Sequence, residues 1–190
     1  DRCNTIRLYS FQTDVVYQVL KRDGVCYSKE EYVRKKYKES AKVFINAYGW
    51  FVKEAQYIVP KPEGAEYPYW AFTDLYNVDQ TGDGHVLTLD VPIGEAILFD
   101  MFDWTKIMQM HYIGENESEE SAFSEELKNM GMSEFQIMTS NFYPEQKARI
   151  QESWNRLFNH QQAIEAGDNS GVHSVQAGLW CIKDEWIVKE

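Results

Sequence analysis

The chain has little cysteine, proline or basic charge, and it has no long apolar run. Its 190 residues include three cysteines and five prolines. Cys3, Cys26 and Cys181 are odd in number and widely spaced, which excludes a disulfide scaffold and the usual zinc-finger patterns. No segment reaches the roughly 18 apolar residues of a membrane helix, so we expect no membrane partner. The first ten residues carry no signal or transit pattern, and together these features predict a cytoplasmic protein with reduced thiols.

Basic residues are too few for a face that follows a nucleic-acid backbone. Thirty acidic residues outnumber 19 basic ones, and the net charge is -11. Such a charge repels phosphates, so we expect no duplex nucleic acid as a partner. The basic residues at 34–38 are flanked by acidic residues at 30, 31 and 39, which is typical of a solvated helix face.

Apolar periodicity predicts a mixture of strands and helices in one α+β domain spanning residues 1–190. Strands are expected over residues 5–13, 25–28, 67–72, 85–92, 95–100 and 175–182. Helices are expected over residues 14–23, 30–59, 100–113 and 144–159. The acidic stretch 115–131 is expected to be an exposed loop leading into a short helix, and 160–171 a loop.

One segment has the oxygen-rich spacing of a calcium loop. It runs from Asp79 to Asp90, with Gly84 at the turn position. A calcium loop of this kind needs a helix on each side, whereas strands are expected here, so a hairpin turn is favoured over a weak calcium site. The four histidines are scattered and none lies in H-E-x-x-H, so we expect no metal cofactor.

Two further patterns carry candidate chemistry. The aromatic residues between Tyr67 and Tyr76 could stack on a planar ligand such as a nucleobase or nicotinamide, or could pack in the core. Asp100 and Asp103, beside Trp104, could supply a general base, although capping the following helix explains at least one of them.

Four stretches carry a family resemblance, namely IRLYSFQT, YPYWAF, VLTLDVPIGEAILFDMFDW and QAGLWCIKDEWIV. Together they resemble a bacterial family known as domain of unknown function 3841 (DUF3841), over most of the chain. That resemblance implies no activity. More distantly, the order of elements resembles the ADP-ribosyltransferase fold, which implies a split antiparallel sheet with a long helix after the first β-α-β unit.

The second resemblance also implies a site. It assigns catalytic positions to Ser10, Tyr69 and Gln176, and NAD-binding positions to Arg7, Tyr9, Gln12 and Trp70. Ser10 departs from the His or Arg of that family, and Gln176 lacks the charge of a carboxylate. Two functions are therefore expected as alternatives. One is an ADP-ribosyltransferase-like protein that binds NAD or another nucleotide and modifies a macromolecule; the other is a non-catalytic module, of bacterial or phage origin, that binds a protein partner.

Overall fold

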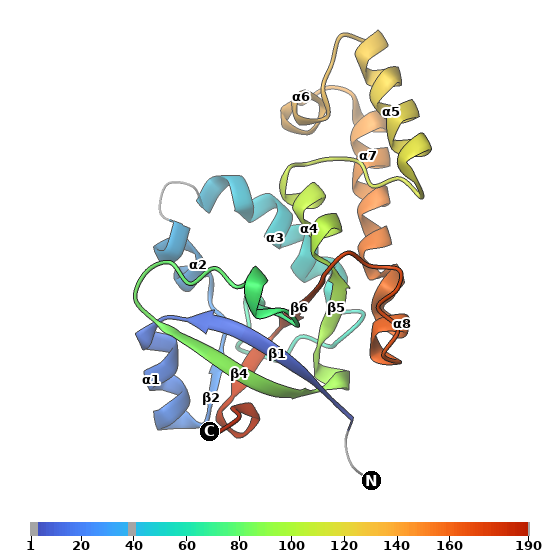
Figure 1. The fold of residues 1–190 in the computed structure, drawn as a ribbon. Helices are drawn as coiled ribbons and strands as arrows, with labels where there is room; N and C mark the ends of the chain where they lie inside the picture. The colour runs from blue at the N-terminus through green and yellow to red at the C-terminus, as the bar shows by residue number, and fades with distance from the viewer. Residues whose placement is uncertain (1–3, 38–40, 190) are drawn as a thin grey trace.

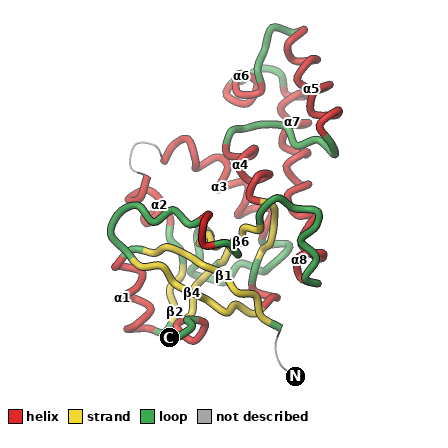
Figure 2. The backbone as a smooth tube through the Cα atoms, viewed as in Figure 1, coloured by secondary structure: helices red, strands yellow, loops and turns green. Residues whose placement is uncertain are grey.

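The computed structural model describes residues 4–37 and 41–189, and its centre is a five-stranded antiparallel sheet (Figure 1). Helices cover both faces of the sheet, as the secondary-structure colours of Figure 2 make clear. In spatial order the strands are β4 (His85–Pro92), β1 (Thr5–Gln12), β3 (Tyr69–Phe72), β6 (Val175–Leu179) and β5 (Ile97–Asp100). Two short strands, β2 (Val25–Tyr27) and β7 (Cys181–Lys183), pair separately. The predicted α+β class is confirmed.

The position of β1 corrects the hairpin prediction. β1 pairs with β4 from Thr5↔Pro92 to Gln12↔His85, and it pairs on its other side with β3 through Tyr9↔Phe72. The turn-rich run 78–84 therefore joins two strands that are not neighbours. Local sequence signals mark a turn but do not reveal that a distant strand lies between the two it connects.

The helices mostly follow the predicted periodicity. Their bounds are α1 (Asp14–Asp23), α2 (Glu30–Tyr37), α3 (Ala41–Ala55), α4 (Met101–Met108), α5 (Glu117–Asn129), α6 (Glu134–Thr139), α7 (Pro144–Ser153) and α8 (Gln161–Glu165), with short 3-10 turns η2 (Leu75–Asn77), η3 (Ile93–Glu95), η4 (Trp154–His160) and η5 (Asp184–Trp186). The predicted helix 30–59 corresponds to α2 and α3, and residues 38–40 lie outside the described residues. The predicted loops 115–131 and 160–171 were partly wrong, because α5 begins at Glu117 and α8 lies in the second segment.

Two apolar cores lie on opposite faces of the sheet. On the face that we call the α3 face, Tyr48 and Phe51 of α3 pack with Phe99 and Trp104. On the other, the α1 face, Val16 and Leu20 of α1 share a core with strand residues that include Leu8 and Leu89. Alternate residues of β5 enter different cores, since Phe99 lies in the first and Leu98 in the second, whereas β1 and β4 contribute to the core of the α1 face.

Glycine allows α3 to approach the sheet closely. A Cβ atom on Gly178 of β6 would lie 2.8 Å from Cζ of Phe51. Phe51 is fully buried, so its ring has no free space to enter. This contact fixes α3 over the β3–β6–β5 part of the sheet.

Helices α5, α6 and α7 form a lobe that projects from the sheet (Figure 1). Its own apolar contacts come from buried residues that include Phe123, Leu127, Ile137 and Ile150. Pro144 begins α7, as predicted, directly after Tyr143 in the left-handed region with φ 62°. Among the helices of the described residues, none combines the length and the apolar character needed to cross a bilayer.

Candidate functional site

One row of side chains crosses three neighbouring strands on the α3 face. Tyr9 of β1 is in register with Phe72 of β3, and Phe72 is in register with Gln176 of β6. Residues in register on antiparallel strands share a face, with their Cβ atoms about 4.5–5.5 Å apart. The row therefore joins two predicted site residues, Tyr9 and Gln176, through an aromatic ring.

Gln176 occupies an unusual position in this row. Its residue is only 3% exposed, yet its carboxamide makes no hydrogen bond to another described residue. Among the described residues no fully buried side-chain nitrogen or oxygen lacks a partner, so the amide atoms of Gln176 must reach the surface. Gln176 thus presents a donor and an acceptor at the edge of the aromatic row.

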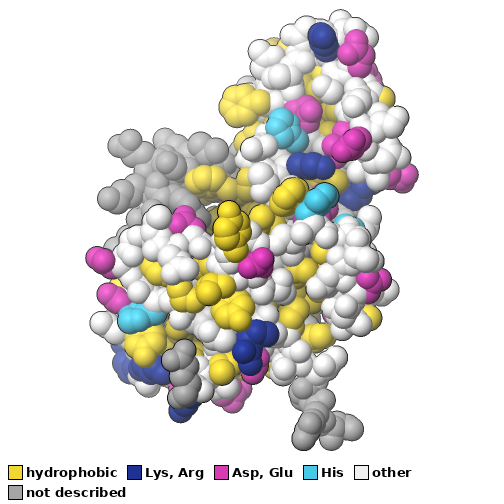
Figure 3. Space-filling view, in the orientation of Figure 1, with side chains coloured by type: hydrophobic (Ala, Val, Ile, Leu, Met, Phe, Trp, Pro, Cys, Tyr) yellow, Lys and Arg dark blue, Asp and Glu magenta, His cyan; other side chains and the backbone are white. Residues whose placement is uncertain are grey.

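The row opens onto a part of the sheet that no helix core covers. Tyr9, Phe11, Phe72 and Val86 are partly exposed, and none of them packs in either apolar core. We call these four residues the open face. In Figure 3, hydrophobic side chains lie at the surface over the region of β1 and β4. The open face therefore offers aromatic rings to a ligand.

Arg7 lies on the same face, two residues from Tyr9. Its Nε donates to Oδ1 of Asp90 at 2.6 Å and its Nη2 donates to Oδ2 at 3.2 Å. The guanidinium holds the pKa of Asp90 below its ordinary value through these hydrogen bonds. Arg7 is thus engaged in a bidentate pair, with half of its side chain exposed.

Ser10 and Gln12 point to the α1 face instead. Ser10 is 1% exposed; its Oγ donates to the carbonyl oxygen of Trp70 at 2.6 Å and accepts from Nε2 of Gln12 at 2.8 Å. The first hydrogen bond ties β1 to β3, and the second joins two residues of β1. The arrangement satisfies the hydroxyl inside the protein and leaves it turned away from Gln176.

Tyr69 also lies on the α1 face, in the core with Leu8 and Leu179. Its hydroxyl is 3.0 Å from Sγ of Cys26 and donates to the carbonyl oxygen of Tyr27 at 3.2 Å. Burial, helped by the contact with Cys26, raises the pKa of Tyr69 far above its ordinary value. The phenol is therefore neutral and bonded within the fold.

The predicted residues consequently do not line one cleft. Ser10, Gln12 and Tyr69 face one side of the sheet, whereas Arg7, Tyr9, Trp70 and Gln176 face the other. Adjacent residues of a strand point to opposite faces, so Tyr9 and Ser10 cannot turn toward the same ligand. Trp70 itself lies under α3, where its Nε1 donates to the hydroxyl of Tyr48 at 2.9 Å and its ring is 4.8 Å from that of Trp104.

Comparison with known families gives one match. Residues 7–188 match the family described as Domain of unknown function (DUF3841). The chain belongs to this family. The match covers β1 from Arg7 onward and all the later strands, and it confirms the resemblance seen in the sequence. No curated protein and no solved structure matches the chain. The resemblance to the ADP-ribosyltransferase fold stays a prediction.

The DUF3841 chain has an acid–histidine pair where β5 ends and just before β6 begins. Oδ2 of Asp100 accepts from the backbone N–H of His173 at 3.0 Å and lies 3.1 Å from its Nδ1, while Oδ1 accepts from the N–H of Phe102. Burial opposes ionisation of Asp100, but these hydrogen bonds lower its pKa overall. The sequence indicated Asp100 as a helix cap, which is confirmed, but gave no sign of His173, 73 residues away.

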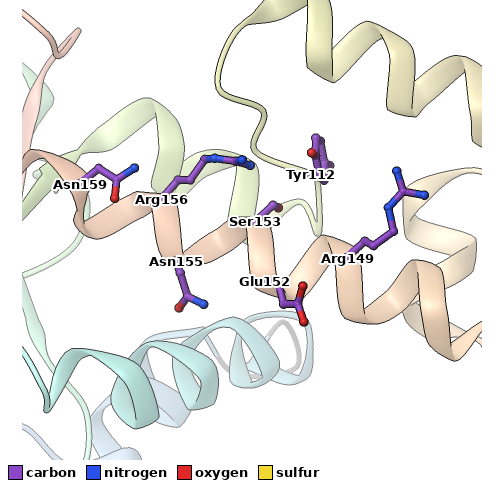
Figure 4. Close-up of a pocket in the computed structure, with 7 residues that line it drawn as sticks. All are labelled: Tyr112, Arg149, Glu152, Ser153, Asn155, Arg156 and Asn159. Carbon is purple, nitrogen blue, oxygen red and sulfur yellow. The ribbon is translucent and has the colours of Figure 1, made fainter.

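Two cavities of this DUF3841 chain lie in the helical lobe, away from the predicted residues. The first cavity has a volume of about 350 Å³ and is lined by Tyr112 and by residues of α7 and η4. In Figure 4, Arg149 and Arg156 extend from this helix on the side where Tyr112 lies. The guanidinium of Arg149 pairs with Glu126, and that of Arg156 donates to the carbonyl oxygen of Ile113. The second cavity, of about 380 Å³, lies between α4, α5 and α6. Because both guanidinium groups of the first cavity are engaged, and Lys106 in the second is paired with Glu120, neither cavity is a ready anion site.

The calcium-like run of the DUF3841 chain forms a turn. The N–H of Thr81 bonds to Oδ1 of Asp79 at 3.0 Å, and Gly82 takes a positive φ of 89°. Across residues 4–37 and 41–189, no group of three or more His, Cys, Asp or Glu side chains is arranged to hold a metal ion.

Proposed function

We propose that the open face binds the planar ring of a nucleotide, NAD or another, and that Gln176 recognises the polar edge of that ring. The observation that carries the proposal is the row Tyr9–Phe72–Gln176, in which two aromatic residues lead to a carboxamide without a hydrogen-bond partner among the described residues. A ring stacked over Phe72 brings its edge beside Gln176, because the two residues are in register. Glutamine can both donate to and accept from such an edge.

Charge favours recognition of the ring over recognition of the phosphates. The net charge of -11 repels a polyphosphate, and Arg7 is already paired with Asp90. Stacking on an aromatic side chain contributes about 1–3 kcal/mol per base and does not require a charged protein. We therefore expect the nucleoside part of the ligand to retain most of the affinity.

Transfer of ADP-ribose to a macromolecule stays a separate prediction. It relied on Ser10, Tyr69 and Gln176 acting together, and these side chains face opposite sides of the sheet. Binding on the open face needs neither Ser10 nor Tyr69. The transfer reaction therefore requires Ser10 of β1, whereas binding on the open face requires its neighbour Tyr9.

Ligand titration distinguishes them. The protein is titrated with NAD, adenosine and nicotinamide, and tryptophan fluorescence is followed, since Trp70 lies two residues from Phe72. We expect Phe72→Ala to weaken binding about tenfold, in line with the stacking contribution, and Gln176→Leu to weaken it about fivefold, as loss of one hydrogen bond implies. Ser10→Ala is the matched control. Ser10 is next to Tyr9 in β1 but faces the α1 side of the sheet, so this change should leave the affinity unchanged.

Two results would count against the proposal. One is saturable binding that Ser10→Ala weakens and Phe72→Ala does not, which would place the ligand on the α1 face. The other is no binding of any of the three compounds. Mass spectrometry for free nicotinamide, run on the same samples, tests the transfer reaction independently.

A further inference from the structure

The helical lobe exposes apolar side chains at its connecting segment. Met130, Phe135 and Phe142 are 40%, 57% and 73% exposed, and all three come from residues 130–142, which join α5 to α7. Two further methionines of this segment, Met132 and Met138, are partly buried against the lobe core. Single exposed apolar residues are ordinary, but three within 13 residues, two of them phenylalanines, concentrate exposed apolar area on one short segment of the lobe.

The same lobe is strongly acidic. Residues 115–152 contain nine glutamates against three basic residues, a net charge of -6 within a chain whose total is -11. Glu117, Glu125, Glu145 and Glu152 make no salt bridge with any residue that the structure describes. Figure 3 shows acidic side chains at several places on the lobe. These unpaired glutamates lie on α5 and α7, the two helices that flank the segment with the exposed rings in the sequence.

We propose that the lobe docks a basic segment of a partner protein, one that carries apolar anchor residues between lysines or arginines. Charge complementarity selects this occupant. A second copy of the chain would bring another lobe of charge -6 against the first, and anionic lipid or nucleic acid would be repelled in the same way. Methionine and phenylalanine side chains form the adaptable apolar surfaces that accept amphipathic segments.

The test uses a model peptide. A fluorescein-labelled peptide of about 18 residues, roughly five helical turns, places leucines on one helix face and lysines on the other. Its fluorescence anisotropy is measured against the full chain. We expect the double variant Phe135→Ser/Phe142→Ser to raise Kd about tenfold. Glu117→Gln/Glu125→Gln should raise Kd severalfold and weaken its dependence on salt. Phe102→Ser removes a ring that is 49% exposed outside the lobe and should leave Kd unchanged.

A second peptide, with every leucine replaced by serine, carries the same charge without the apolar face. We expect it to bind at least tenfold more weakly. The proposal is overturned if this peptide binds as tightly as the first, because attraction would then be charge alone. It is also overturned if the double phenylalanine variant keeps the wild-type Kd, or if sedimentation reveals a dimer that this variant dissociates. The changed side chains are exposed, and unchanged melting temperatures of the variants confirm that loss of binding is not loss of folding.

Discussion

Replacing Gly178 by alanine tests how closely α3 packs on the sheet. The added Cβ would lie 2.8 Å from Cζ and 3.1 Å from Cε1 of Phe51, well inside the roughly 3.5–4.0 Å of a normal carbon contact. The Phe51 ring cannot turn away freely, since the rings of Trp70 and Trp104 lie 5.1 and 5.4 Å from it, centre to centre. Overpacking of this kind costs typically about 1–3 kcal/mol, so we expect Gly178→Ala to lower the free energy of unfolding by about 2 kcal/mol. At about 2–4 °C per kcal/mol for a chain of this size, the melting temperature should fall by about 4–8 °C.

Two further variants make the test specific, with urea unfolding followed by tryptophan fluorescence. Gly49→Ala lies in the same α3 helix, where an added Cβ meets nothing within 4 Å, and should raise stability by about 0.5–1 kcal/mol. In Gly178→Ala/Phe51→Leu, the loss should be smaller than the sum of the two single losses by about 1 kcal/mol, because the clashing ring is gone. A Gly178→Ala protein of wild-type stability, or strictly additive losses in the double variant, would refute the close packing.

Three other predictions follow from single sites. Millimolar calcium should leave the melting temperature unchanged, because the turn at Asp79 lacks flanking helices; a shift of several degrees that Asp79→Ala abolishes would contradict this. Thiol labelling in denaturant without reductant should count three cysteines. In the native protein, burial raises the pKa of Cys181 to about 11, so Cys181 should label slowly until the pH approaches that value. A bridged pair of cysteines, or rapid labelling of native Cys181 at pH 8, would contradict these expectations. Asp100→Asn should lower the free energy of unfolding by about 1–2 kcal/mol at pH 7. Because the pKa of Asp100 is lowered in the folded state, its charge stabilises the fold above about pH 4, and the stability difference between variant and wild type should vanish as the pH falls through that lower pKa. Urea unfolding at several pH values measures this difference, and a difference that does not change with pH would refute the prediction.

Local signals in the sequence predicted most strands and helices but not how the strands pair. Gly24 ends α1 in the left-handed region, and Asp100 caps α4, as their residue types indicate. The pairing of β1 with β4 depends on contacts about 80 residues apart, for which a single sequence offers no local pattern. Helix α5 was missed in part because only Phe123 and Leu127 of its 13 residues are buried.

The sequence predicted which strands meet at the site but not which side chains share a face. Tyr9, Phe72 and Gln176 converge because β3 lies between β1 and β6, which agrees with the expected neighbourhood of these strands. Placing Tyr9 and Ser10 in one cleft ignored the alternation of side chains along a strand, which sequence alone could have excluded. The pairing of His173 with Asp100 could not have been foreseen, since both residues have ordinary local roles.

The central claim, that the carboxamide of Gln176 meets a ligand ring, can be tested on the amide itself. In protein labelled with ¹⁵N-glutamine, the side-chain resonance of Gln176 is identified by its loss in Gln176→Leu, and NAD is then added. We predict that this resonance shifts in proportion to occupancy. That of Gln161, whose amide is bonded to the backbone of Leu98 and Ala96, should stay in place. Saturable NAD binding with an unshifted Gln176 resonance would contradict the claim.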